Sequence, residues 1–147
     1  MTDSGKAQEI PWVDISRFHI HAELTEILQR LARDYPTLAA LESIGKSHED
    51  RDIWLMTLTN QATGPADEKP AMYIDGNIHA GEVTGCNVAL HTIDMLLHGY
   101  GSDAEITELL DTRTFYIHRP ACPAGWRGTV PDNAADAALI GAPVALV

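Results

Sequence analysis

Residues 71–85 read AMYIDGNIHAGEVTG, and the rest of the chain is organised around this stretch. It begins with a short apolar run, residues 71–74, which is typical of a buried strand. Asp75 and Gly76 end that run, and a long segment with an apolar stripe follows at once. The stretch therefore predicts a strand, a turn and a helix, and the turn carries His79 and Glu82 three residues apart.

His79 and Glu82 are residue types that bind zinc, since catalytic zinc sites often use two His and one Glu. Gly81 between them makes a tight backbone turn easy. The alternative is a solvated surface pair on a helix, which is common for His-x-x-Glu. The helical zinc motifs do not fit, because Val83 stands where the inverted motif needs a second His. Placement between a strand and a buried helix favours a metal site.

Upstream of this stretch, the sequence predicts a helix and a hairpin. Leucines, Ile27 and Ala32 recur at helical spacing over residues 21–34, and Pro36 ends that helix. Residues 37–44 and 53–59 have strand composition and are expected to pair as a hairpin. Residues 61–70 are a loop by composition.

Downstream, a second helix is expected over residues 82–98, because its apolar residues form one continuous stripe. Ser102 and Glu105 have the spacing of a capping box, so a short third helix should follow. We expect its inward face to carry Ile106, Leu109 and Leu110. Residues 114–117 then predict a strand. Strands and helices alternate along the chain, so the fold class is α/β.

Composition narrows the range of partners. The chain has 147 residues, of which 45% are hydrophobic, and this is enough for one domain with a core. Its net charge of −11 argues against a nucleic-acid partner. No apolar run approaches the ~20 residues needed to span a membrane, and the N-terminus lacks a signal-peptide pattern. Cys86 and Cys122 are too few for a disulfide framework. We therefore expect a cytoplasmic protein without a membrane partner.

Residues 71–90 resemble the zinc-site segment of the zinc carboxypeptidases, the carboxypeptidase A-like metallopeptidases. That family shows an apolar strand, then Gly-x-x-His-x-x-Glu, then a helix, and residues 76–82 read Gly-Asn-Ile-His-Ala-Gly-Glu. Further similarity lies at Tyr35-Pro36, at residues 44–47 and 51–53, and at residues 109–117. The resemblance therefore covers about residues 20–117, the N-terminal part of the family's catalytic domain.

This resemblance implies a partial α/β/α sandwich with a mixed sheet, carboxypeptidase-like (phosphorylase/hydrolase-like) and truncated. It implies that His79 and Glu82 are two of three protein ligands of a catalytic zinc ion. The implied reaction is hydrolysis of a peptide at its C-terminus. A relative of the deacylase type, a zinc amidohydrolase acting on an acyl amino acid, is an alternative that these residues do not separate. A second alternative is a non-catalytic remnant without metal.

The resemblance ends near residue 117. The family's Asn-Pro-Asp-Gly step, third His ligand, substrate clamp and general-base Glu have no counterpart here. Half of residues 118–147 are Ala, Pro or Gly, and a frameshift near residue 118 of a GC-rich gene would explain this divergent tail. His118 has two readings, a polar residue at a strand end or a locally supplied third ligand. The expected organisation is a loose leader at 1–10, the partial catalytic domain at 11–117 and the tail at 118–147.

Overall fold

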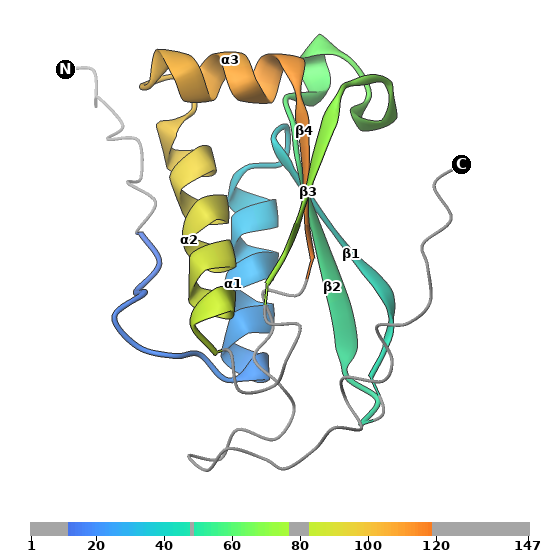
Figure 1. The fold of residues 1–147 in the computed structure, drawn as a ribbon, viewed down its shortest axis with the longest axis vertical. Coiled ribbons are helices and arrows are strands. Elements are labelled where there is room, and N and C mark those ends of the chain that lie inside the picture. The colour runs from blue at the N-terminus through green and yellow to red at the C-terminus, as the bar shows by residue number, and fades with distance from the viewer. Residues whose placement is uncertain (1–11, 48, 77–82, 119–147) are drawn as a thin grey trace, which may run out of the picture.

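The computed structural model describes residues 12–47, 49–76 and 83–118 (Figure 1). Their elements follow the expected order closely. The helices are α1 (His21–Asp34), α2 (Val83–Gly99) and α3 (Ala104–Thr112), and the strands are β1 (Ala39–Lys46), β2 (Asp52–Leu58), β3 (Ala71–Asp75) and β4 (Thr114–His118). Two short 3-10 turns, η1 (Gln61–Thr63) and η2 (Ala66–Glu68), lie within the expected loop. The leader and nearly all of the tail lie outside the described residues.

The four strands form one mixed sheet in the order β1-β2-β4-β3. β1 and β2 are the expected antiparallel hairpin, and β2 also pairs antiparallel with β4. β3 pairs parallel with β4, and α2 and α3 form the connection between these two strands. Because neighbouring parallel strands run the same way, the C-terminal ends of β3 and β4 lie together at one edge of the sheet.

Both α1 and α2 pack on the same side of the sheet (Figure 1). The apolar stripes predicted for these helices are buried. They pack against the strand side chains that point toward the helices, which are alternate residues along each strand. The fully buried side chains of this core include Leu24, Leu28, Leu31, Met56, Leu58, Leu90, Ile93, Leu97 and Ile117. In the described part of the expected sandwich, α1 and α2 thus cover one face of the sheet (Figure 1).

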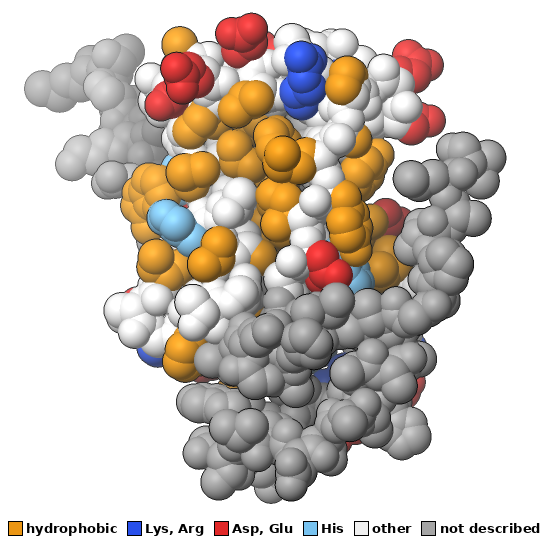
Figure 2. All heavy atoms as spheres, in the orientation of Figure 1, with side chains coloured by type: hydrophobic (Ala, Val, Ile, Leu, Met, Phe, Trp, Pro, Cys, Tyr) orange, Lys and Arg blue, Asp and Glu red, His pale blue; other side chains and the backbone are white. Residues whose placement is uncertain are grey.

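The prediction that residues 71–74 form a buried strand is wrong about burial. Met72 and Tyr73 are 57% and 58% exposed, because β3 is the last strand in the order of the described sheet. Val88 and Met95 of α2 and Leu109 of α3 are exposed hydrophobic side chains as well. The helices that carry them lie on the face of the molecule shown in Figure 2. An apolar run therefore identified the strand correctly but not its position in the sheet.

α3 begins one residue later than the capping box predicted. Asp103 is its N-cap, and this carboxylate accepts hydrogen bonds from the backbone N–H groups of Glu105 and Ile106. Ser102 instead donates its hydroxyl hydrogen to the carbonyl of Gly99, at 3.0 Å. Leu110 is fully buried as expected, whereas Leu109 is 40% exposed.

One buried carboxylate connects the N-terminal segment to α2. Asp94 of α2 is fully buried, and its Oδ2 atom accepts a hydrogen bond from the backbone N–H of Val13 at 2.8 Å. Its Oδ1 atom lies 3.2 Å from Nδ1 of His98, whose ring stacks on Trp12.

Among the described residues, no helix is long and apolar enough to span a lipid bilayer.

Candidate functional site at one edge of the sheet

The candidate site lies at the edge of the sheet where β3 and β4 both end. Asp75 and His118 are the last residues of these strands and are partners in the parallel register. The Oδ1 atom of Asp75 lies 3.4 Å from Nδ1 of His118. The His118 side chain is 11% exposed and that of Asp75 is 25% exposed. An imidazole supported by a carboxylate thus stands at this edge.

Gly76 brings the end of β3 against the start of α2. A Cβ atom built on Gly76 would lie 2.7 Å from the carbonyl oxygen of Gly85, closer than real Cβ atoms approach. The backbone N–H of Gly76 also donates to the carbonyl of His118, at 3.4 Å. Gly76 therefore contacts both β4 and α2, and its missing side chain is what permits the contact with the helix.

The two predicted zinc ligands, His79 and Glu82, lie outside the described residues, so the structure does not test them. They belong to the connection between Gly76 and Val83, the first described residue of α2. Within residues 12–47, 49–76 and 83–118, no three His, Cys, Asp or Glu side chains lie close enough together to hold a metal ion. The donor types of His79, Glu82 and His118 nevertheless match those of a catalytic zinc site.

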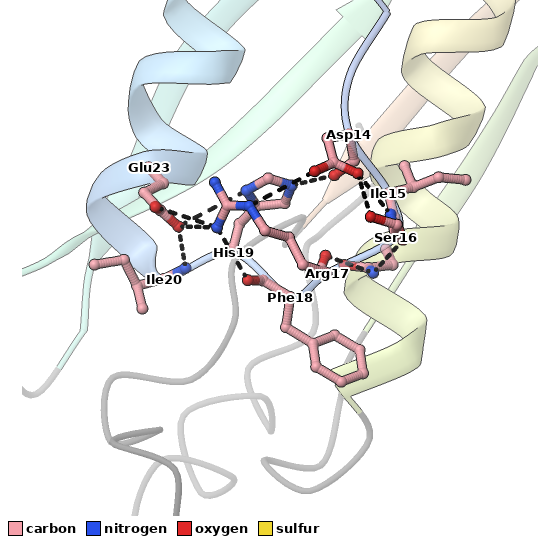
Figure 3. A network of polar contacts seen from close by, with 9 residues as sticks. Asp14, Ile15, Ser16, Arg17, Phe18, His19, Ile20 and Glu23 are labelled. Atoms are coloured by element: carbon pink, nitrogen blue, oxygen red, sulfur yellow. Dashed lines mark hydrogen bonds and ion pairs between the residues drawn. The ribbon is translucent and has the colours of Figure 1, made fainter.

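The N-terminal segment supports the first turns of α2. The Nδ2 group of Asn87 donates to the carbonyls of Ile15 and Arg17, at 3.2 and 3.1 Å. From there the segment continues to the start of α1, where Arg17 donates to both carboxylate oxygens of Glu23 (Figure 3). Glu23 also accepts a hydrogen bond from the backbone N–H of Ile20. These contacts connect the starts of the two helices that cover the sheet.

The hydrogen bonds from Arg17 and then Ile20 lower the pKa of the Glu23 carboxyl, and the same carboxylate raises the pKa of Arg17. Both side chains are well exposed, at 52% for Arg17 and 39% for Glu23. Water and salt therefore screen the pair, which contributes little to stability. Its contacts join the N-terminal segment to the first turn of α1.

Sequence reasoning missed Asn87 and the pairing of Asp75 with His118. Asn87 is a polar residue among small and apolar residues in the first turns of the predicted helix. Its position there was the sequence signal available for a specific contact. The pair depends on the register between β3 and β4, which no pattern within either strand encodes. His118 itself was singled out, and its position beside the end of β3 is the new observation.

Comparisons with known proteins find a matching family model, related sequences and similar structures. The model of the family described as zinc carboxypeptidase matches residues 24–127. Carboxypeptidase D of Anas platyrhynchos is 33% identical over 75% of this chain, and carboxypeptidase B of Astacus astacus is 34% identical over 82%. The crystal structure of thrombin activatable fibrinolysis inhibitor superposes on 73% of the chain with a TM-score of 0.65 and 25% identity.

The fold is also shared with the carboxypeptidase A of Helicoverpa armigera, with a TM-score of 0.64 at 22% identity. The chain spans only part of each relative. It covers 8% of the duck carboxypeptidase D and 38% of the crayfish carboxypeptidase B. It covers 26% of the thrombin activatable fibrinolysis inhibitor chain.

Proposed function

The chain belongs to the zinc carboxypeptidase family, and on that premise we propose that it is the N-terminal part of a metallocarboxypeptidase catalytic domain. Such a hydrolase removes residues from the C-terminus of a peptide. The observation that carries the proposal is the family match across β3, α2 and the Gly-x-x-His-x-x-Glu connection between them. Peptides are therefore the proposed substrate class.

His79 and Glu82 are the proposed zinc ligands of this segment. When bound, zinc polarises a scissile carbonyl and lowers the pKa of bound water toward ~7. The described residues supply the frame for these ligands. Gly76 and Gly85 hold the strand end against the helix start, and Asn87 fixes the first turns of α2 to the N-terminal segment.

These 147 residues carry no segment resembling the family's general base or substrate clamp. General acid–base catalysis typically contributes 10²–10⁴-fold to a rate, so we expect the chain alone to hydrolyse peptides very slowly. Release of a C-terminal residue from a synthetic peptide measures this directly. Zinc-dependent turnover at the rate of a complete carboxypeptidase would contradict the expectation.

Zinc stoichiometry tests the ligand assignment. Because the chain carries two of the family's three zinc ligands, we expect the purified chain to bind zinc weakly, and His79→Ala and Glu82→Gln each to weaken that binding further. His91→Ala is the matched control, because His91 is an exposed imidazole on α2. A His79→Ala variant that binds zinc as tightly as the wild-type chain would contradict the ligand assignment.

A further inference from the structure

We propose that a pocket between α1 and the β1–β2 hairpin binds a small aromatic carboxylate through Arg33 and Trp54. β1 and β3 are the two outer strands of the described sheet, so this pocket and the candidate site at the end of β3 lie at opposite sides of the sheet. The inference goes beyond the proposed function and does not depend on zinc. Three features support it: the lining of the pocket, the fixed position of its aromatic ring, and a cation without an acidic partner.

The first feature is the lining. The pocket has a volume of about 370 Å³, which lies within the range of small-molecule sites. Its lining residues are Gln29, Ala32 and Arg33 of α1, Leu41 of β1 and Trp54 of β2. Three of them, Ala32, Leu41 and Trp54, are partly buried and pack against the core. They form an apolar floor, and the indole ring in it favours a flat aromatic ligand, which can stack on it.

The second feature is the fixed position of the indole ring. The Nε1–H group of Trp54 donates to Oγ1 of Thr25 in α1, at 3.0 Å. Thr25, Gln29 and Ala32 follow one another at steps of four and three along the helix, so they share one helix face. The hydrogen bond therefore holds the ring beside the helix residues that line the pocket. A ligand that stacks on a ring already held in place pays less conformational entropy on binding.

The third feature is the charge of Arg33. This exposed residue of the last turn of α1 has no carboxylate partner among the described residues. The neighbouring ion pair of the helix joins Arg30 to Asp34 instead, at 3.7 Å. None of the five lining residues is acidic, although the net charge of the chain is −11. Because a guanidinium group binds a carboxylate through two parallel hydrogen bonds, the pocket favours an aromatic ligand that carries a carboxylate.

A larger pocket on α3 provides a contrast within the same chain. Its volume is about 500 Å³, and Asp103, Glu108 and Asp111 are among its lining residues. These carboxylates repel an anion. An aromatic carboxylate should therefore distinguish the two pockets by charge, and should leave the backbone amide signals of α3 unchanged.

The competing reading is that Arg33 only interacts with the C-terminal dipole of α1 and that the pocket holds water. An NMR titration of the full chain with 2-naphthoate and with its neutral analogue 2-naphthamide separates the two readings. We expect 2-naphthoate to shift the indole Nε1–H signal of Trp54 with a dissociation constant of about 1 mM, as befits a ligand of this size. The spectrum of Trp54→Phe assigns that signal. 2-Naphthamide should bind several-fold more weakly.

Arg33→Gln tests the cation directly. It should weaken 2-naphthoate binding about fivefold, which is the upper range for an exposed charge pair, and should leave the binding of 2-naphthamide unchanged. Arg113→Gln is the matched control, because it removes the same charge from the C-cap of α3, outside the pocket. It should leave both ligands unaffected, and a urea midpoint verifies that each variant folds. The inference is overturned if about 10 mM 2-naphthoate leaves the Trp54 signal in place, if wild type binds the two ligands equally, or if Arg33→Gln binds 2-naphthoate as tightly as wild type.

Discussion

The two ends of the parallel strand pair β3–β4 are built differently. At the end where these strands begin, Lys69 donates three hydrogen bonds of 2.7–2.8 Å, to Thr59, Asn60 and Thr63. There the side chain of Asn60 donates to Asp111 at 2.7 Å and to the hydroxyl of Tyr100 at 2.9 Å. These contacts tie the end of β2 to α3, and we call this region the closed end.

The opposite end, where β3 and β4 stop, is the site edge. Among the described contacts there, Gly76 to His118 and Asp75 to His118 are both 3.4 Å long. Contacts of that length are weak. The shorter of these described polar contacts thus lie at the end of the sheet away from the candidate site.

Cavity variants give the largest effect expected from this comparison. Leu110 at the closed end and Ile117 beside the site edge are both fully buried. Truncating either to Ala should cost ~2–5 kcal/mol of unfolding free energy, and the cost is larger where the surroundings cannot collapse into the cavity. We therefore expect Leu110→Ala to lie near the upper limit and Ile117→Ala near the lower, in urea denaturation.

Leu109→Ala is the matched control for the first variant, since Leu109 is the neighbouring leucine and is 40% exposed. Its loss should be clearly smaller than that of Leu110→Ala. Equal losses of unfolding free energy for Leu110→Ala and Ile117→Ala would contradict the expectation that the two ends differ in how far they can collapse into a cavity.

Sequence patterns predicted the elements well, because helix and strand periodicity are local properties. The boundaries of α1 were predicted without error, and the hairpin and the order of elements are confirmed. Errors arose where the deciding partner was remote. Exposure of Met72 depends on which strands flank β3, and Leu109 is exposed because only one face of the short α3 meets the core.

The candidate site was predictable only in part, for the same reason. The motif identified His79 and Glu82 by residue type and spacing. Nothing local identifies Asp75 as the partner of His118, since the residues lie 43 positions apart and meet through strand register. The capping-box spacing of Ser102 and Glu105 predicted the helix start one residue early, because the carboxylate of Asp103 alone accepts from the backbone N–H groups of Glu105 and Ile106.

Gly76→Ala tests the site edge with an intermediate effect. The added Cβ would meet the carbonyl oxygen of Gly85 at 2.7 Å and Cβ of Ala89 at 3.2 Å. The strand end and α2 must then separate, at a cost of ~1–3 kcal/mol typical of overpacking. We expect a lower urea midpoint together with weaker zinc binding.

The double variant Gly76→Ala/Ala89→Gly identifies the contact responsible. It relieves the approach to Ala89 but leaves the backbone carbonyl of Gly85 in place, so stability should stay low. Full recovery would show that the side-chain contact dominates, and that the glycine pair does not determine how closely β3 approaches α2.

The smallest expected effect is the pH dependence that Asp111 contributes at the closed end. Hydrogen bonds from Asn60 and then Tyr100 lower the pKa of Asp111 below its ordinary value of 3.8. The ionised carboxylate therefore stabilises the folded chain fully above pH 3.8, and this contribution is lost as the pH falls through the lower folded-state pKa. Wild type should exceed Asp111→Asn in unfolding free energy at neutral pH, and the gap should narrow on acidification.

Since both main donors are neutral, the narrowing should persist in about 1 M salt, where exposed charge pairs are screened. A gap that disappears in salt at neutral pH would instead assign the effect to Lys69, whose charge is the weaker cause of the lowered Asp111 pKa.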